Sequence, residues 1–199
     1  MENKEHIDDI ALIDLDGTLC NYDFAMQRDL DSLLSPREKR YVIGLHKKHP
    51  PYIVSRMDLI KSNGEWWENL PRFELGFDVL CLLKKYNFYI SVLTQGPRSS
   101  PSAWSHKVLW CKKQIPEMDI TITRRKSLVY GKILVDDYIP YIEQWLKSHP
   151  RGLVIMPAHE WNQNFVHPNV IRYDGNNLKE IERAVKIAKN RKSGETLKL

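Results

Sequence analysis

The chain has 199 residues, of which 42% are hydrophobic and 28% are charged, and its formal net charge is +5. This composition is typical of one globular domain with a modest insertion, and it excludes wholesale disorder and two full independent domains. No apolar run approaches the roughly 20 residues that cross a bilayer, and residues 1–9 lack the apolar stretch of a secretion signal, so we expect a cytoplasmic protein without membrane association.

The sequence matches neither of two common zinc-binding patterns. Cys20, Cys81 and Cys111 form an odd set without C-x-x-C spacing, which predicts reduced thiols and no structural zinc site. His159 begins an H-E-x-x-H pattern, but Gln163 stands at the second histidine, so a zinc protease is excluded. Basic residues between positions 183 and 192 occur with Glu180 and Glu182 on one helical pattern, which favours a solvated helix face over a nucleic-acid surface.

Short apolar runs rich in β-branched residues alternate with helical stretches along most of the chain. Strands are predicted at residues 10–13, 88–93, 120–123, 132–135, 152–156 and 170–173, and helices at 73–86, 139–147 and 178–190. This alternation predicts an α/β fold with a Rossmann-like parallel sheet flanked by helices. Ligands of such sheets bind at the carboxyl ends of the strands.

The pattern changes between Cys20 and Pro71, where helical segments occur without a convincing strand. Helices are predicted at residues 24–34, 36–45 and 55–61, separated by turn-rich segments. We therefore predict a core of residues 1–19 and 73–199, and a small all-helical cap of residues 20–72 inserted after the first strand. The cap is expected to fold over the carboxyl edge of the sheet.

Two carboxylates follow the first predicted strand directly. Asp14 and Asp16 are two residues apart, so in extended chain both side chains face the same way, and Gly17 then permits a tight turn whose amides can approach an anion. Adjacent carboxylates repel each other unless a hard cation neutralises them, and Mg²⁺ prefers oxygen ligands. A plain acidic turn is the alternative, whereas Thr18 and Leu19 exclude an EF-hand calcium loop.

Three further signals lie at or near strand ends. Asp136 and Asp137 follow a strand, where they could bind magnesium or cap the next helix. Thr94 could bind a phosphoryl oxygen or simply form a turn. Lys126, ten residues before Asp136, could stabilise a transferring phosphoryl group, although a lone loop lysine is usually only solvated.

The order of these signals, D-x-D-G-T, then threonine, then lysine, then D-D, resembles the haloacid dehalogenase (HAD) superfamily of phosphotransferases. The resemblance implies a magnesium cofactor and a covalent aspartyl-phosphate mechanism, with Asp14 as nucleophile and Asp16 as acid and base. It further implies phosphate binding by Gly17, Thr94 and Lys126. The implied metal ligands are Asp14, Asp16 through its backbone carbonyl, Asp136 and Asp137.

Within that superfamily the chain looks most like the 5'(3')-deoxyribonucleotidases. The segment from Thr123 to Asp137 is similar to that family's lysine segment, and residues 103–107 are similar to its tryptophan-containing helix. The likeness implies a base pocket formed by Tyr22, Trp66 and Trp67. Two residues depart from it: Gln95 stands where the family usually has serine, and Tyr138 where arginine often follows the acidic pair.

The tryptophan pair can also be weighed physically. Neighbouring residues on a helix diverge by about 100°, so Trp66 and Trp67 do not both face one core, and at least one is expected to be available for stacking on a base. The alternative is that both pack at the junction of cap and core.

The expected substrate is a nucleoside monophosphate, most plausibly a deoxynucleotide, and we do not expect nucleic acid as a partner; a homodimer stays open. The alternatives are a 3'-phosphatase acting on nucleic-acid ends, a phosphatase of another small ester, and a non-catalytic binding protein on a degenerate core.

Overall fold

Parallel strands form one central sheet in the computed structural model, which describes residues 9–44, 48–97, 100–192 and 194–199. Within these residues the strand order is β3-β2-β1-β4-β5-β6. The strands are β1 (Ile10–Ile13), β2 (Tyr89–Thr94), β3 (Asp119–Ile122), β4 (Ile133–Val135), β5 (Leu153–Pro157) and β6 (Val170–Tyr173). The predicted α/β fold with a Rossmann-like parallel sheet is confirmed, and the predicted strand ends differ by at most one residue.

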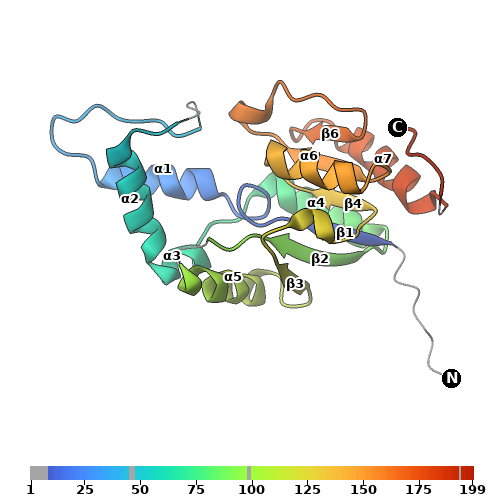
Figure 1. Cartoon of the computed structure of the whole chain (residues 1–199), viewed down its shortest axis with the longest axis horizontal. Coiled ribbons are helices and arrows are strands. Elements are labelled where there is room, and N and C mark those ends of the chain that lie inside the picture. The colour runs from blue at the N-terminus through green and yellow to red at the C-terminus, as the bar shows by residue number, and fades with distance from the viewer. Residues whose placement is uncertain (1–8, 45–47, 98–99, 193) are drawn as a thin grey trace.

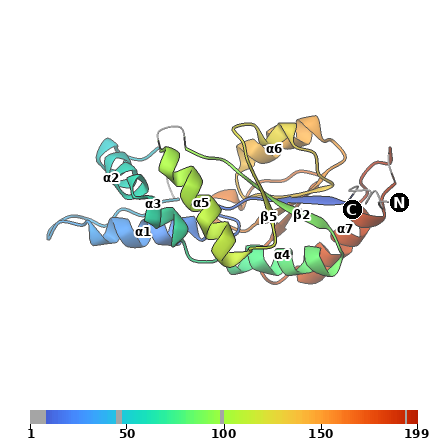
Figure 2. The ribbon, with the colours of Figure 1, turned by 90° about the horizontal axis from the view of Figure 1, so that it is seen from below.

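Both faces of the sheet are buried, which explains why its strands read as continuous apolar runs. Ala11 and Ile13 point to one face and Leu12 to the other, as the two-residue repeat of a strand requires. The first face packs against α4 (Glu74–Lys85), α5 (Pro101–Gln114) and α7 (Leu178–Asn190), and the second against α6 (Ile139–Ser148). Figure 2 shows α6 on one side of the sheet and α4 with α7 on the other.

The strand register brings the predicted site residues together. Ile13 of β1 is paired with Val92 of β2 on one side and with Val135 of β4 on the other. The next residue, Asp14, donates its backbone N–H to the Val135 carbonyl over 2.9 Å. Asp14 and Asp136 therefore leave neighbouring strands at the same edge of the sheet.

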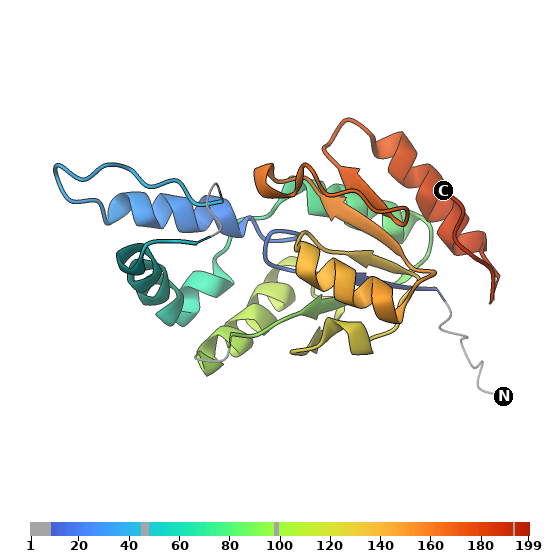
Figure 3. The same cartoon turned by 45° about the horizontal axis from the view of Figure 1, so that its top comes forward.

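Helices α1 (Tyr22–Ser32), α2 (Pro51–Ser62) and α3 (Gly64–Glu68) lie together beyond that carboxyl edge (Figures 1 and 3). The two chain segments that join them to the core run side by side, with Asn21 N–H donating to the Pro71 carbonyl and Phe73 N–H to the Leu19 carbonyl. The predicted boundaries of the cap fall on these two segments.

One predicted cap helix is wrong. Residues 36–44 of the expected helix 36–45 are not helical, and Leu45 lies outside the described residues. The Gln27 side chain on α1 donates to the Tyr41 carbonyl and accepts from the Ile43 N–H, and these bonds hold the segment in an irregular path along α1. Helix α3 was not among the predicted helices, although helical spacing was assumed for Trp66 and Trp67, and the predicted residues 103–107 cover only part of α5. No helix among the described residues is long and apolar enough to span a membrane.

Candidate active site

Three buried carboxylates meet where β1 and β4 end. Asp14, Asp136 and Asp137 each offer one carboxylate oxygen, and these oxygens lie within 4.8 Å of one another. Burial raises the pKa of Asp136 to about 6, with Lys126 opposing the shift and the charge of Asp14 adding to it. Burial also raises the pKa of Asp137 well above its ordinary value, and the negative charges of Asp136 and Asp14 increase that shift. The cluster therefore favours either protons or a cation.

Lys126 supplies the one ammonium group that contacts this cluster among the described residues. The short helix η1 (Lys126–Leu128) places Lys126 Nζ 2.8 Å from Asp14 Oδ1 and 2.7 Å from Asp136 Oδ2. Burial lowers the pKa of Lys126, but the charges of Asp136 and Asp14 outweigh that effect and the net shift is upward. One fixed positive charge among three carboxylates leaves room for a divalent cation.

The donor set fits magnesium. All three groups are carboxylates, the ligand type that Mg²⁺ prefers. Asp14 Oδ1 is buried, and apart from the Lys126 ammonium 2.8 Å away no polar group of the described residues is bonded to it. The Asp16 carboxylate lies outside this cluster, so any part of Asp16 in metal binding would fall to its backbone carbonyl.

A second group centres on Lys107, which the sequence analysis did not single out. Lys107 projects from α5, its side chain is 2% exposed, and its Nζ lies 2.6 Å from Asp16 Oδ2. The same ammonium donates to Thr94 Oγ1 (3.3 Å) and to the Gln95 carbonyl (2.8 Å). Burial raises the pKa of Asp16, Lys107 opposes that shift, and the charge of Asp14 adds to it. Lys107 thus joins the predicted acid/base to the predicted phosphate-binding threonine.

The turn after Asp16 wraps around Asp137. Gly17 has φ of 77°, in the left-handed region that favours glycine, and a methyl group there would overlap the Asp137 carboxylate. Thr18 Oγ1 donates to Asp137 Oδ1 over 3.0 Å. The Gly17 N–H donates to the Cys20 carbonyl, so this amide closes the turn and is not free for the phosphate contact that was expected of it.

Comparisons with known proteins agree with this arrangement at the level of the fold. No protein-family model matches the sequence, and no curated protein matches it either. An HAD family hydrolase from Deinococcus radiodurans R1, solved with bound phosphate and sodium, is similar with a TM-score of 0.55 at 13% identity, over 90% of this chain and 96% of that one. An HAD hydrolase of family IA, variant 3, from Entamoeba histolytica is similar with a TM-score of 0.51 at 15% identity, over 92% and 100% of the two chains. This chain has the haloacid dehalogenase fold.

His159 is a further residue at the site of this HAD fold that sequence reasoning missed. Its ring stacks between Phe73 and Trp161, with both centroid distances at 5.1 Å. Nε2 lies 2.7 Å from the Gly17 carbonyl oxygen, which can only accept, so Nε2 carries the proton and donates. Nδ1 faces Asp23 Oδ2 of α1 at 3.8 Å. His159, rejected as a zinc ligand, therefore connects the cap to the turn that follows Asp16.

The three residues of the predicted base pocket separate in the structure. Tyr22 and Trp67 line the cavity over the carboxylates, which measures about 590 Å³, whereas Trp66 is not among the described residues that line it. Trp66 donates its Nε1–H to Asp29 Oδ2, and Trp67 donates to the Lys61 carbonyl. Base binding by these residues stays a prediction.

The two departures from the nucleotidase pattern also have defined positions. The Gln95 side-chain amide donates an N–H to the Arg124 backbone carbonyl, and the backbone carbonyl of Gln95 accepts from the Lys107 ammonium. Tyr138 is 47% exposed at the cavity, and its backbone N–H donates to Asp136 Oδ1. Within the part of the chain that the structure describes, neither side chain is hydrogen-bonded to Asp14 or Asp16.

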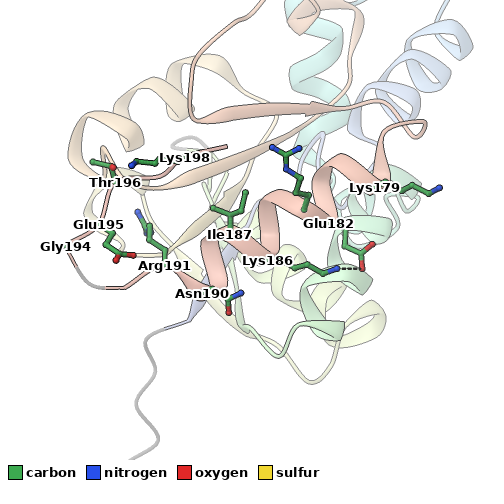
Figure 4. Close-up of a pocket in the computed structure, with 11 residues that line it drawn as sticks. Lys179, Glu182, Lys186, Ile187, Asn190, Arg191, Gly194, Glu195, Thr196 and Lys198 are labelled. Carbon is green, nitrogen blue, oxygen red and sulfur yellow. Dashed lines mark ion pairs between the residues drawn. The ribbon is translucent and has the colours of Figure 1, made fainter.

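A larger cavity, of about 910 Å³, lies far from this edge, between α7 and the C-terminal segment (Figure 4). Its basic side chains are interspersed with Glu182 and Glu195, and Glu182 pairs with Lys85 and Lys186. It holds no cluster of carboxylates suited to a metal among the described residues. The carboxyl edge of the sheet is therefore the candidate active site.

Proposed function

We propose that this chain is a magnesium-dependent phosphatase that hydrolyses nucleoside monophosphates through an aspartyl-phosphate formed on Asp14. The observation that carries the proposal is the pairing of two buried groups at one sheet edge: Asp14 with Lys126 and the acidic pair, and Asp16 with Lys107 and Thr94. A nucleophile, an acid/base and phosphate-binding groups are thus adjacent. The phosphate bound to the Deinococcus HAD hydrolase is in keeping with this chemistry.

In the first step an oxygen of Asp14 attacks phosphorus, and the bond from phosphorus to the ester oxygen breaks. Asp16 gives its proton to the departing oxygen, and the raised pKa of Asp16 helps it to hold that proton beforehand. In the second step Asp16 takes a proton from water, whose oxygen attacks phosphorus. The bond from phosphorus to the Asp14 oxygen then breaks, which releases phosphate and restores the Asp14 carboxylate. Lys126, Lys107 and Thr94 are placed to neutralise or hydrogen-bond the phosphoryl oxygens.

The metal would be held by Asp14, Asp136 and Asp137, with the backbone carbonyl of Asp16 as a further ligand. When bound, Mg²⁺ supplies positive charge that lets the phosphate approach these carboxylates. Lys126 restrains Asp14 and Asp136 on the side of the cluster that it contacts.

The substrate part of the proposal rests on the likeness to the 5'(3')-deoxyribonucleotidases and on the cap. Tyr22 and Trp67 border the site cavity, which is large enough for a nucleotide. The cap helices also lie over the sheet edge, which would hinder a polymer end and disfavours the 3'-phosphatase alternative. A binding protein on a degenerate core is disfavoured because Asp14, Asp16, Thr94, Lys126 and Asp136 are all in place.

A substrate panel tests the proposal. Purified protein with Mg²⁺ is assayed on deoxynucleoside and ribonucleoside monophosphates, acetyl phosphate and a 3'-phosphorylated oligonucleotide, with Asp14→Asn protein as the background control. We expect release of phosphate from mononucleotides well above that background. Preference for the oligonucleotide would favour the 3'-phosphatase, and no release from any ester would leave a binding protein.

A further inference from the structure

A second cavity adjoins the candidate active site. It measures about 880 Å³ and lies between the cap and the segment after β5. Tyr22, Asp23, Asp137 and Tyr138 line both this cavity and the one over the carboxylates. Because the two cavities share a boundary at Asp137, a group attached to a phosphate at Asp14 can extend from one into the other.

The tryptophans expected to stack on a base are already engaged by protein groups. Trp67 is 3% exposed, Lys107 Nζ lies 5.0 Å from its ring centroid, and the Trp66 ring meets it edge-on at 5.0 Å. Trp66 packs edge-on against Tyr22 as well, and its Nε1 donates to Asp29. Stacking requires a free ring face, and these contacts leave little of either ring for a ligand.

Trp161 offers a better platform in the second cavity. It belongs to the short helix η2 (Glu160–Asn162), is half-buried, and lines the cavity together with Tyr138. His159 stacks on one face of Trp161 with an interplanar angle of 15°. The ring is oriented further by its Nε1, which donates to Asp23 Oδ2 over 3.3 Å. Tyr138 meets the same ring in a T-shaped contact, with the two centroids 6.4 Å apart. A rigid aromatic ring that is supported by His159 on one face and bordered by Tyr138 is suited to stack a flat ligand.

The polar groups of this cavity select among flat ligands. Asp23 and Glu160 contribute carboxylates, and Gln163 contributes an amide. Among the described residues that line it, the one basic side chain is His49, which is already hydrogen-bonded through Nδ1 to the Tyr41 hydroxyl. A second phosphate would be repelled here, whereas amino groups on a neutral ring would find acceptors. Lys61 and Arg124 line the cavity over the carboxylates and are not among the described residues that line the second one, so the first cavity is the one that suits an anion.

We propose that the second cavity binds the leaving group of the substrate, as a nucleobase that carries an exocyclic amino group and stacks on Trp161. The inference rests on the proposed function, because it takes the phosphate to be held at Asp14. It assigns base recognition to the segment after β5 and to Tyr138, and it removes that role from Trp66 and Trp67.

The test compares Trp161→Leu with Trp66→Leu, a matched change of a tryptophan that is not among the described residues lining either cavity. Each variant is assayed on deoxyadenosine monophosphate and on acetyl phosphate, which has no ring. We expect Trp161→Leu to lower the ratio of kcat/KM for the nucleotide to that for acetyl phosphate by about 5- to 150-fold, mainly through KM. Trp161→Phe should restore most of that ratio, and Trp66→Leu should leave it unchanged.

Binding without turnover separates this inference from the proposed function. Calorimetry measures the dissociation constant for deoxyadenosine, which we expect to be higher in Trp161→Leu and in Tyr138→Leu than in the unaltered protein. Tyr138→Leu is included because the Tyr138 side chain is half exposed and less critical for folding. Thymidine, which lacks an amino group, should bind more weakly than deoxyadenosine or deoxycytidine. If the protein hydrolyses acetyl phosphate but Trp161→Leu does not change nucleoside binding, the proposed base subsite is wrong and the proposed phosphatase function still stands. Nucleoside binding that depends on Trp161, without hydrolysis of any ester, would uphold the subsite and refute the enzyme.

Discussion

Asp14 is the residue on which the proposed chemistry depends most directly. Replacing it with asparagine keeps the shape of the side chain but removes the nucleophilic oxygen and one negative charge from the buried cluster. We expect Asp14→Asn to lower kcat by roughly 10⁴-fold or more, while the fold survives. Phosphate release and circular dichroism measure the two effects. Turnover near that of the unaltered protein would exclude Asp14 as nucleophile.

Besides its proposed contact with the phosphoryl oxygens, Lys107 is expected to act through Asp16, with which it is ion-paired. Its ammonium is 2% exposed and pairs with a carboxylate that is 29% exposed. Lys107→Met keeps the length of the side chain but removes the opposing charge, so the pKa of Asp16 should rise further. We expect a cost of about 1–3 kcal/mol in the free energy of unfolding, and a shift of the pH–rate profile toward higher pH.

A double-mutant cycle checks that account of Lys107. In Lys107→Met with Asp16→Asn, no buried charge is left without its partner, so the combined loss of stability should be smaller than the sum of the two single losses. Losses that simply add, together with an unmoved pH profile in Lys107→Met, would show that Lys107 only fills space.

The sequence predicts some of these residues far better than others, for a physical reason. Asp14, Thr94 and Asp136 end or directly follow parallel strands, so chain position alone places them at one edge. Lys107 lies on α5 near Lys112 and Lys113, and nothing local distinguishes a lysine that turns into the core from two that do not. His159 reaches Gly17 across 142 positions of sequence, a contact that only the folded sheet creates.

At the level of elements, the close approach of α4 to the turn after Asp16 depends on Gly76. A methyl group at this position would overlap the carbonyl oxygen of Thr18. Glycine to alanine within a helix ordinarily stabilises a protein by about 0.5–1 kcal/mol. Here we expect the opposite sign: Gly76→Ala should destabilise by about 1–3 kcal/mol, because α4 or the turn must move.

Thermal unfolding of Gly76→Ala measures that change, and Cys81→Ala on an exposed position of the same helix is the control. Because the displaced turn carries Asp16 and contacts Asp137, phosphatase activity should fall in Gly76→Ala and not in the control. Stabilisation by Gly76→Ala would mean that α4 and the turn are not in contact as described.

Cap elements were harder to predict than core elements. The segment from Pro36 has residues that favour helix, including glutamate, lysine and arginine, yet the Gln27 side chain binds its backbone and no helix forms. Local propensity is a weak guide where one distant side chain satisfies backbone groups in another conformation. Core strands, by contrast, are identified by apolar runs that burial on both faces requires.

At the level of the whole molecule, alternation of strands and helices was sufficient to predict the sheet, and it places the expected ligand site at the carboxyl edge. Which residues of the cap contact the substrate could not be predicted in the same way. Which aromatic residues have a free ring face depends on packing among Tyr22, Trp66, Trp67 and Lys107. The contact of Tyr22 with Trp66 lies within the cap, and that of Lys107 with Trp67 joins core and cap, each across about 40 positions of sequence. The residues proposed for the reaction can therefore be predicted from their positions at strand ends, whereas those that would select the substrate depend on long-range packing.

The carboxylate cluster predicts how the stability of the whole protein depends on pH and magnesium. In the folded protein the pKa of Asp136 is about 6, above the ordinary value for aspartate, and that of Asp137 is shifted in the same direction. The folded state then binds protons more tightly than the unfolded chain. Without a divalent cation, the contribution of these groups to stability is fully present below the ordinary pKa of about 4, and that of Asp136 is lost as pH rises through about 6.

Magnesium should reverse this loss, because it binds the deprotonated carboxylates and replaces the missing protons. We expect the rise in melting temperature on adding Mg²⁺ to be small near pH 5 and to grow until about pH 7, and EDTA should abolish it together with phosphatase activity. Melting curves with and without Mg²⁺ at each pH isolate the site, since other titrating groups contribute equally to both. Asp136→Asn should melt higher than the unaltered protein at pH 7 without metal and should respond little to Mg²⁺. A magnesium effect that is equal at every pH, or unchanged in Asp136→Asn, would place the cation elsewhere.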